Sequence, residues 1–210
     1  MNQKNDKNSL GLDSCFEDLN NPIELFKKWF SEAEKNEIND PNALALATSD
    51  KNNQPNARMV LLKGLSDKGF VFYTNFNSKK GGELKLNQKA SMCFHWKSLR
   101  RQVRVIGKVE EVTTQEADNY YNSRPYKNRI SAWASSQSQI LNKRETFLNK
   151  IKDFEKKYPD ENNVPRPPHW SGWRLLPHEI EFWVDGEGRI HERLNYKKSD
   201  SNWKKEILYP

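Results

Sequence analysis

Short apolar runs separated by turn residues mark the first half of the chain. Residues with β-branched or aromatic side chains concentrate in five segments: 43–48 (ALALAT), 58–65 (RMVLLKGL), 69–74 (GFVFYT), 90–96 (ASMCFHW) and 101–112 (RQVRVIGKVEEV). Runs of this length and composition, bounded by Gly, Asn, Asp and Ser, are typical of β-strands. The SDKG sequence between the second and third runs predicts a hairpin loop.

Helical periodicity occurs before, between and after these runs. Apolar residues recur every three or four positions over residues 22–33, directly after Asn21, which is a favourable N-cap. Pro22 suits the first position of that helix. Three further helices are predicted for residues 79–87, 114–123 and 140–158, the last one amphipathic.

Residues 172–210 return to the strand pattern, in GWRLLP, HEIEFWV, GRIHERLNY and NWKKEILYP. Many antiparallel-type strands with a few helices predict a mainly β (α+β) fold, an antiparallel closed or split β-barrel with peripheral helices. No GxGxxG motif and no βαβ alternation occur, which argues against a doubly wound nucleotide-binding fold. Residues 1–20, rich in Asn, Asp, Lys and Ser, predict a flexible tail.

Composition narrows the class of protein. The 210 residues carry a formal net charge of +7, which suits a nucleic acid, an anionic lipid or a small phosphorylated ligand, or simply reflects frequent lysine. The longest apolar run, Ala43–Ala47, is far shorter than the roughly 20 residues of a membrane span. A polar N-terminus and two cysteines predict a reduced cytoplasmic protein without a disulfide framework or metal site.

Basic residues inside the strand patterns are the first candidates for chemistry. Arg58 and Lys63 bracket an apolar run, and Arg101 and Arg104 flank Gln102. Such residues either form a solvated outer face or hold an anion at one rim of the barrel. The planar guanidinium of arginine suits the second role, because it binds phosphate through two hydrogen bonds.

Three loop segments add further candidates. In NSKKGGE (77–83), two lysines and a serine stand at a predicted helix N-terminus, an arrangement that suits phosphate although it is not a Walker motif. Arg124 ends a predicted helix, where it either holds an anion or complements the helix dipole. The SAWASSQSQ segment (131–139) either donates hydrogen bonds to phosphate or sugar oxygens or forms an ordinary Ser-rich loop.

The most distinctive segment is IEFWVDGEGRIHERLNY (180–196). We expect a strand over 180–184, a turn, and a second strand over 189–194. A period of two would then place Arg189, His191 and Arg193 on one face. That face either binds an anion or pairs with the neighbouring glutamates, and His191 becomes a candidate anion ligand or proton-transfer group.

Six motifs in this order resemble those of the pyridoxine/pyridoxamine 5′-phosphate oxidase family. They are RMVLLK (58–63), FYTNFNSKK (72–80), RQVRVIG (101–107), YYNSRP (120–125), AWASSQS (132–138) and EFWVDGEGRIHERLNY (181–196). The resemblance runs from about residue 22 to Pro210, and the EFW…RIHER signature is highly specific for the family. It implies a split-barrel flavoprotein that binds flavin mononucleotide (FMN).

The resemblance also implies a cofactor site. Its residues would be Arg58, Met59, Val60, Leu61, Leu62, Lys63, Tyr73, Thr74, Lys79, Lys80, Gln102, Gln137, Ser138, Trp183 and Arg193. Arg58, Lys79 and Lys80 would hold the FMN phosphate, with Lys79 where arginine is common. Part of each site would come from a second subunit, so the resemblance implies a homodimer with FMN at the subunit interface.

For the substrate, the resemblance implies Lys63, Tyr120, Arg124, Asn128, Arg189 and His191. Asn128 stands where the family usually has serine. Pyridoxamine or pyridoxine 5′-phosphate would stack on the flavin, with Arg189 and His191 as the catalytic residues that orient its C4′ group. Hydride transfer to FMN and reoxidation by O₂ would give pyridoxal 5′-phosphate and H₂O₂.

Under this reading the chain forms one compact domain, with residues 21–160 as the FMN-binding portion and 161–210 completing the barrel and the dimer interface. Three alternatives remain open. A related split-barrel flavin enzyme would act on another substrate, which the RIHER signature disfavours. A basic, aromatic-rich barrel could instead bind nucleic acid, and a carrier could bind pyridoxal phosphate without turnover. The main reading involves neither nucleic acid nor a membrane.

Overall fold

One antiparallel sheet organises residues 7–200 and 202–210, which the computed structural model describes. Seven strands follow the order β2-β1-β5-β6-β7-β4-β3, and β8 pairs with β7 while β9 pairs with β8. The strands are β1 (Ala43–Ser49), β2 (Pro55–Leu61), β3 (Gly64–Ser66), β4 (Gly69–Asn75), β5 (Lys89–Trp96), β6 (Arg101–Glu111), β7 (Trp170–Val184), β8 (Glu192–Ser199) and β9 (Asn202–Ile207).

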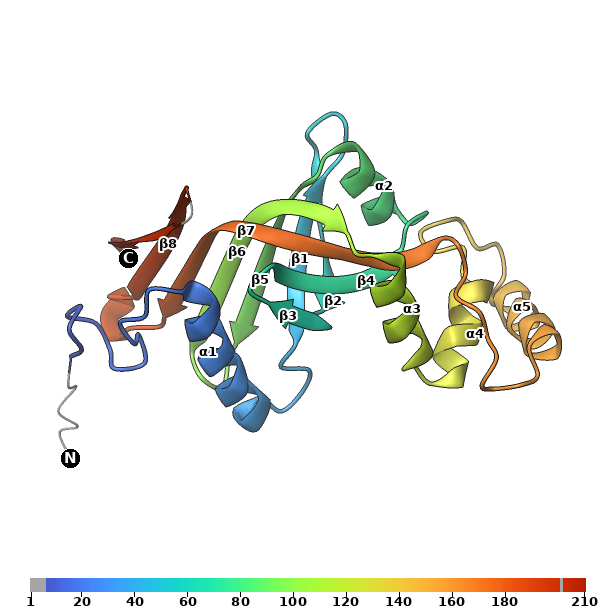
Figure 1. Ribbon diagram of the computed structural model, residues 1–210, viewed down its shortest axis with the longest axis horizontal. Helices are drawn as coiled ribbons and strands as arrows, with labels where there is room; N and C mark the ends of the chain where they lie inside the picture. The colour runs from blue at the N-terminus through green and yellow to red at the C-terminus, as the bar shows by residue number, and fades with distance from the viewer. Residues whose placement is uncertain (1–6, 201) are drawn as a thin grey trace.

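Five α-helices surround the sheet within the described residues: α1 (Pro22–Asn36), α2 (Lys79–Leu86), α3 (Thr114–Asn122), α4 (Tyr126–Ala134) and α5 (Arg144–Lys157). Figure 1 shows α3, α4 and α5 gathered at one end of the sheet, whereas β8 and the C-terminus lie at the other. This architecture confirms the expected antiparallel, mainly β fold with peripheral helices. Within the described chain, no helix has the length and apolar character needed to cross a membrane.

Helix α1 begins where the sequence predicts it, because the Asn21 side chain accepts a hydrogen bond from the Ile23 backbone N–H. Its apolar face covers the sheet through a cluster of aromatic rings centred on Phe26, which is fully buried. The Phe26 ring lies 4.9 Å from Phe70 and 5.0 Å from Phe94, both edge-on. This edge-to-face contact fixes α1 against β4 and β5.

Several boundaries differ from the predicted ones. The run over 58–65 divides into β2 and β3, since residues 62 and 63 leave the strand, and the SDKG hairpin joins β3 to β4 with Ser66 opposite Gly69. Helix α4 has no predicted counterpart, because no side chain caps it and polar residues, Ser131 among them, separate its apolar residues. Helix α5 begins only at Arg144 and has no buried side chain, so the predicted amphipathic face does not enter the core.

The expected strand over 189–194 is wrong in its first half. Residues Glu187–Arg189 form a 3-10 turn, and Arg189 adopts a left-handed φ of 65°. A Cβ at Gly186 would lie 1.8 Å from the Ile190 carbonyl oxygen, so the chain turns too tightly there for a strand. Arg189, His191 and Arg193 therefore do not alternate along one strand, and only Arg193 lies in β8.

The N-terminal segment also departs from the expected flexible tail. Leu12 and Phe16 are buried and belong to the main hydrophobic core. Trp29 Nε1 donates a hydrogen bond of 2.9 Å to the Cys15 carbonyl, and Tyr196 Oη donates one of 2.9 Å to the Leu19 carbonyl. Residues 7–20 are thus packed, while residues 1–6 of the predicted tail lie outside the described chain. The expected division of the remaining chain at residues 160 and 161 stays a prediction.

Replacing Phe26 by alanine should lower the free energy of unfolding by about 3–5 kcal/mol, because the cavity removes ring contacts on three sides. Urea denaturation measures this change. Ile38→Ala is the matched control, since that side chain is 89% exposed and its loss should change the free energy by less than about 0.5 kcal/mol. Equal effects of the two substitutions would contradict the role assigned to the aromatic cluster.

Candidate functional site

A cavity of about 620 Å³ opens between β2, β4, the start of β7 and helices α2 to α5. Many residues predicted for the cofactor and substrate sites line it, namely Met59, Val60, Leu61, Lys63, Tyr73, Thr74, Lys80, Tyr120, Arg124, Asn128 and Gln137. These residues come from segments up to 78 positions apart in the sequence. The fold therefore brings most of the predicted motifs together around one space.

One end of the cavity is cationic. Lys80 Nζ lies 3.1 Å from Thr74 Oγ1, 3.2 Å from Gln137 Oε1 and 3.4 Å from Ser78 Oγ. Burial, and then the nearby Arg58 guanidinium, lower the pKa of Lys80, while Glu83 partly offsets this shift. A bound anion would favour the protonated ammonium, so this corner is suited to phosphate.

Part of the cavity lining is aromatic. The rings of Tyr73 and Tyr120 stack with centroids 4.0 Å apart, and Trp170 stacks on Tyr73 at 5.4 Å. Burial raises the pKa of both tyrosines above its ordinary value. A flat, partly apolar wall of this kind suits a planar heteroaromatic ligand.

Arg124 places a positive charge beside the aromatic residues of the cavity. Its guanidinium lies 4.7 Å from the Trp170 ring centroid, a cation–π contact that orients the side chain. Arg124 Nη1 is buried and has no hydrogen-bond partner among the described atoms. Because an unpaired buried donor is costly, this nitrogen indicates a missing acceptor, and a phosphate oxygen in the cavity would supply it.

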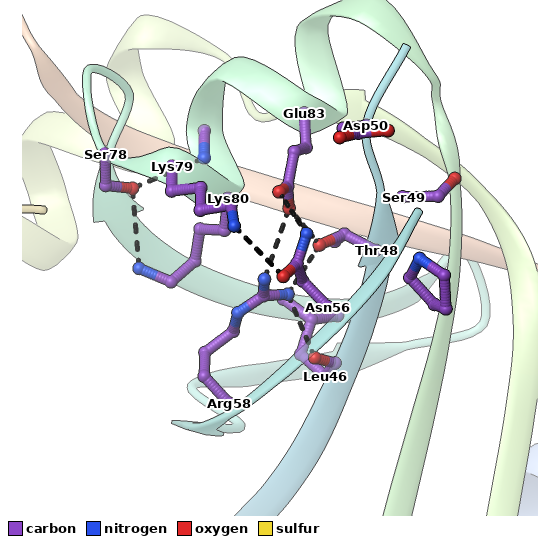
Figure 2. Close-up of polar contacts among 12 residues, drawn as sticks. Leu46, Thr48, Ser49, Asp50, Asn56, Arg58, Ser78, Lys79, Lys80 and Glu83 are labelled. Carbon is purple, nitrogen blue, oxygen red and sulfur yellow. Dashed lines mark hydrogen bonds and ion pairs between the residues drawn. The ribbon is translucent and has the colours of Figure 1, made fainter. Parts of the chain in front are cut away.

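Two predicted phosphate ligands, Arg58 and Lys79, stand beside the cavity without lining it. Figure 2 shows both of them around Glu83, which projects from α2. Arg58 Nη2 lies 3.2 Å from Glu83 Oε2, and Lys79 Nζ donates to Asn56 Oδ1 at 3.1 Å. Gly81 lets α2 approach the strand before it, since a Cβ there would lie 2.4 Å from the Phe76 carbonyl oxygen.

A second group of predicted residues lies elsewhere on the sheet. Gln102 on β6 is opposite Trp183 on β7, which in turn is opposite Arg193 on β8. Strand β7 runs from Trp170 in the cavity wall to Trp183, and Figure 1 shows it crossing from the α3–α5 end toward β8. At about 3.3 Å per residue, roughly 40 Å of strand separates these two tryptophans.

The expected catalytic residues belong to this second group. The His191 ring packs on Trp183 at 4.7 Å, and its Nδ1 accepts a hydrogen bond of 3.1 Å from the Gly186 backbone N–H. The same nitrogen lies 3.1 Å from Asp185 Oδ1, a contact that becomes an ion pair when the imidazole is protonated. Arg189 is exposed.

Arg193 is held differently, by a buried carboxylate. Its guanidinium donates to Glu181 Oε1 at 2.9 Å, and Glu181 also accepts from Arg104 at 3.1 Å on its other oxygen. Arg193 thus pairs with a neighbouring glutamate, which is one of the two alternatives left open by the sequence for the 180–196 segment. This pairing also restrains Arg193, whose guanidinium donates a further hydrogen bond of 2.9 Å to the Tyr209 carbonyl.

Two predicted residues lie outside both groups. Leu62 is buried in the main core, and Ser138 is exposed with a φ of 70°. Conversely, sequence reasoning missed several cavity residues, namely Asn75, Ser123, Ser131, Ser135, Phe147 and Trp170. Asn75, Ser123, Ser131 and Ser135 carried a signal, because they lie within quoted motifs or the SAWASSQSQ segment, whereas Trp170 ended an irregular Pro-rich connector.

Comparison with known proteins decides the family. Residues 30–158 match the family described as "Pyridoxamine 5'-phosphate oxidase". The chain belongs to this family. Residues 170–210 match a second description, "Pyridoxine 5'-phosphate oxidase C-terminal dimerisation region", which covers β7, β8 and β9. The oxidase family assignment thus spans both groups of predicted residues.

Relatives in the oxidase family cover nearly the whole chain. A protein of Pelagibacter ubique named "Pyridoxine/pyridoxamine 5'-phosphate oxidase" is 62% identical over 207 residues, which are 98% of this chain and 100% of the relative. A protein of Agrobacterium fabrum with the same name is 52% identical and covers 94% of this chain and 96% of its own.

Solved structures agree on the fold of the oxidase family. PhzG from Burkholderia lata 383, in complex with tetrahydrophenazine-1-carboxylic acid, has a TM-score of 0.87 at 30% identity and covers 93% of this chain and 96% of its own. A pyridoxamine 5′-phosphate oxidase-related, FMN-binding protein from Nostoc punctiforme has a TM-score of 0.71 at 18% identity, with 88% and 97% covered. The expected split-barrel fold is confirmed.

Replacing Arg124 by methionine tests the anion assignment. The variant should weaken binding of pyridoxamine 5′-phosphate by about ten- to a hundred-fold, the value of a charge-assisted contact. Its ligand-free thermal midpoint should not fall, because burial already lowers the pKa of Arg124 and its Nη1 lacks a partner. Calorimetric titration and thermal denaturation measure the two effects, with the exposed Lys127→Met as control. Unchanged affinity in the Arg124 variant would refute the assignment.

Proposed function

We propose that this chain is an FMN-dependent oxidase that converts pyridoxamine and pyridoxine 5′-phosphates to pyridoxal 5′-phosphate. The observation that carries the proposal is the unpartnered, buried Arg124 Nη1 beside a stacked aromatic wall, in a chain of the oxidase family. An aromatic ring with a phosphate group would satisfy both features at once. The names of the close relatives support the same substrates.

The residues present fit the cofactor. Arg58, Lys79 and Lys80 would hold its phosphate, and the strand residues from Met59 to Lys63 would lie along the flavin. Lys80 fits this role because its three neighbours in the cavity are neutral oxygen atoms, so no carboxylate there neutralises it directly. When bound, FMN would accept a hydride equivalent from C4′ of the substrate and return the electrons to O₂, with release of H₂O₂.

The chain's own residues would bind and orient the substrate. Lys63, Tyr120, Arg124 and Asn128 line the cavity and would hold the substrate phosphate. Arg124 would contribute most, since the Trp170 ring already orients its guanidinium. His191 would hold the C4′ amine or alcohol near the flavin through its Nε2, because Nδ1 accepts from Gly186 and leaves the proton on the other nitrogen.

We further propose a homodimer in which each site takes residues from both subunits. The cavity and the Gln102–Trp183–Arg193 group lie too far apart along β7 for one small ligand to touch both within a chain. The match of residues 170–210 to a dimerisation region supports contact between copies on the strands that carry the second group. A cytoplasmic location remains a prediction that accompanies this function.

The proposed activity predicts a yellow protein after reconstitution with FMN. Under anaerobic conditions, pyridoxamine 5′-phosphate should reduce the flavin and so bleach its visible absorbance band. Admitting air should restore the band, with one H₂O₂ formed per pyridoxal 5′-phosphate. Stopped-flow absorbance and a peroxide assay measure both steps. A protein that takes up no FMN, or one that binds FMN without bleaching, would contradict the proposal; the second result would leave the carrier alternative.

His191→Ala should slow turnover roughly tenfold without abolishing it, because the side chain orients the substrate by a hydrogen bond and no protein base is obligatory. Steady-state H₂O₂ production at full flavin occupancy measures the effect. The exposed His178 at the bulge of β7 provides the control, and His178→Ala should keep wild-type turnover. Complete loss of activity in the His191 variant would contradict a purely orienting role.

A further inference from the structure

A buried carboxylate lies behind the cationic corner of the cavity. The side chain of Glu83 on α2 is only 5% exposed and accepts hydrogen bonds from residues of two strands. Thr48 Oγ1 donates to Oε2 at 2.5 Å, Asn56 Nδ2 donates to Oε1 at 2.7 Å, and Arg58 Nη2 lies 3.2 Å from Oε2. Figure 2 shows these three side chains converging on Glu83.

All three partners of Glu83 donate hydrogen bonds to it, so the residue at this position must offer acceptors on both side-chain atoms. A carboxylate only accepts hydrogen bonds, whereas a glutamine amide would present an NH₂ group to one of these donors. The carboxylate also fixes the direction of the Asn56 amide. With Nδ2 turned to Glu83, Oδ1 faces away and accepts from Lys79 Nζ at 3.1 Å. Glu83 thus places the Lys79 ammonium through Asn56.

Glu83 restrains Arg58 in the same way. Arg58 Nη1 donates to Thr48 Oγ1 at 2.5 Å and to the Leu46 carbonyl at 3.1 Å, while Nη2 faces Glu83. The guanidinium is therefore held by three separate acceptors before any ligand binds. Prior restraint of this kind reduces the conformational entropy lost on binding.

The charge of the corner also depends on Glu83. Three cations, Arg58, Lys79 and Lys80, together with one carboxylate leave a net charge of two positive units. A phosphate monoester carries about −1.5 to −2 at neutral pH, so the corner nearly balances that charge. Without Glu83, a third uncompensated cation would remain in a partly buried place.

We infer that Glu83 is a positioning residue for the phosphate of the cofactor, acting on Arg58 directly and on Lys79 through Asn56. This inference rests on the proposed function, because FMN is the ligand assigned to this corner. Glu83 itself would not touch the phosphate, since its carboxylate carries the same sign of charge and both of its oxygens are already engaged by Thr48, Asn56 and Arg58. Its contribution should therefore be specific to the phosphorylated flavin.

Glu83→Gln tests this inference in the full-length apoprotein. The new amide would turn Asn56 around, directing the Asn56 NH₂ at Lys79 and releasing that ammonium. We expect the Kd for FMN to rise about tenfold, while the Kd for riboflavin, which lacks the phosphate, changes less than about twofold. Quenching of flavin fluorescence measures both constants. A general loss of structure would weaken both flavins equally.

The double variant Glu83→Gln/Asn56→Asp provides a rescue. A carboxylate at position 56 would accept from the new amide and from Lys79, so it restores both contacts and the net charge. FMN affinity should return to within about threefold of wild type, whereas Asn56→Asp alone should weaken FMN binding because two carboxylates would face each other. Glu110→Gln removes another Arg–Glu pair, with Arg174, and should leave both affinities unchanged.

The outcomes separate this inference from the proposed function. A wild-type protein that binds neither flavin would contradict the proposed function and, with it, the role of Glu83. If the wild type prefers FMN to riboflavin and Glu83→Gln keeps that preference, the role of Glu83 is refuted while the proposed function stands. Failure of the double variant to recover FMN binding would likewise overturn the relay through Asn56.

Discussion

The backbone pairing of β7 is the constraint on which the rest of the structure depends. Along one edge β7 pairs with β6 from Trp173 to Val184, and along the other it pairs first with β4 and then with β8. Buried backbone groups must find partners, so a strand of fifteen residues requires several neighbours. The change of partner coincides with a bulge opposite Gly107, where a Cβ would lie 2.2 Å from the Leu176 carbonyl oxygen.

This one strand also determines how the candidate site is divided. The half that pairs with β4 contributes Trp170 to the cavity. The half that pairs with β8 carries Trp183, whose cross-strand neighbours are Gln102 and Arg193. Each half holds its functional side chains firmly, through stacking on one side and through the buried Glu181 on the other. Under the proposed homodimer, residues from a second copy would complete each of these two groups.

Local signals in the sequence predicted much of this fold, and long-range contacts account for what they missed. The Asn21 cap and the alternating strands could be recognised because propensity and capping act over a few residues. Arg189 was misplaced because the predicted turn extends further along the chain than expected, through the 3-10 residues Glu187–Arg189. The motifs contain many of the residues that line the cavity, but no role for Glu83 was predicted, since its partners Thr48 and Asn56 lie 35 and 27 positions away in the sequence.

Helix α5 borders the cavity although it contributes no buried residue to the core. The helix contributes Phe147 to the lining, yet none of its side chains is fully buried, and it packs on α4 through half-buried rings such as Trp133 and Phe154. Segments with so little buried area open at free energies far below that of global unfolding. Amide hydrogens of α5 should therefore exchange before those of the sheet. Opening of α5 would therefore widen the cavity while every strand of the sheet stays paired.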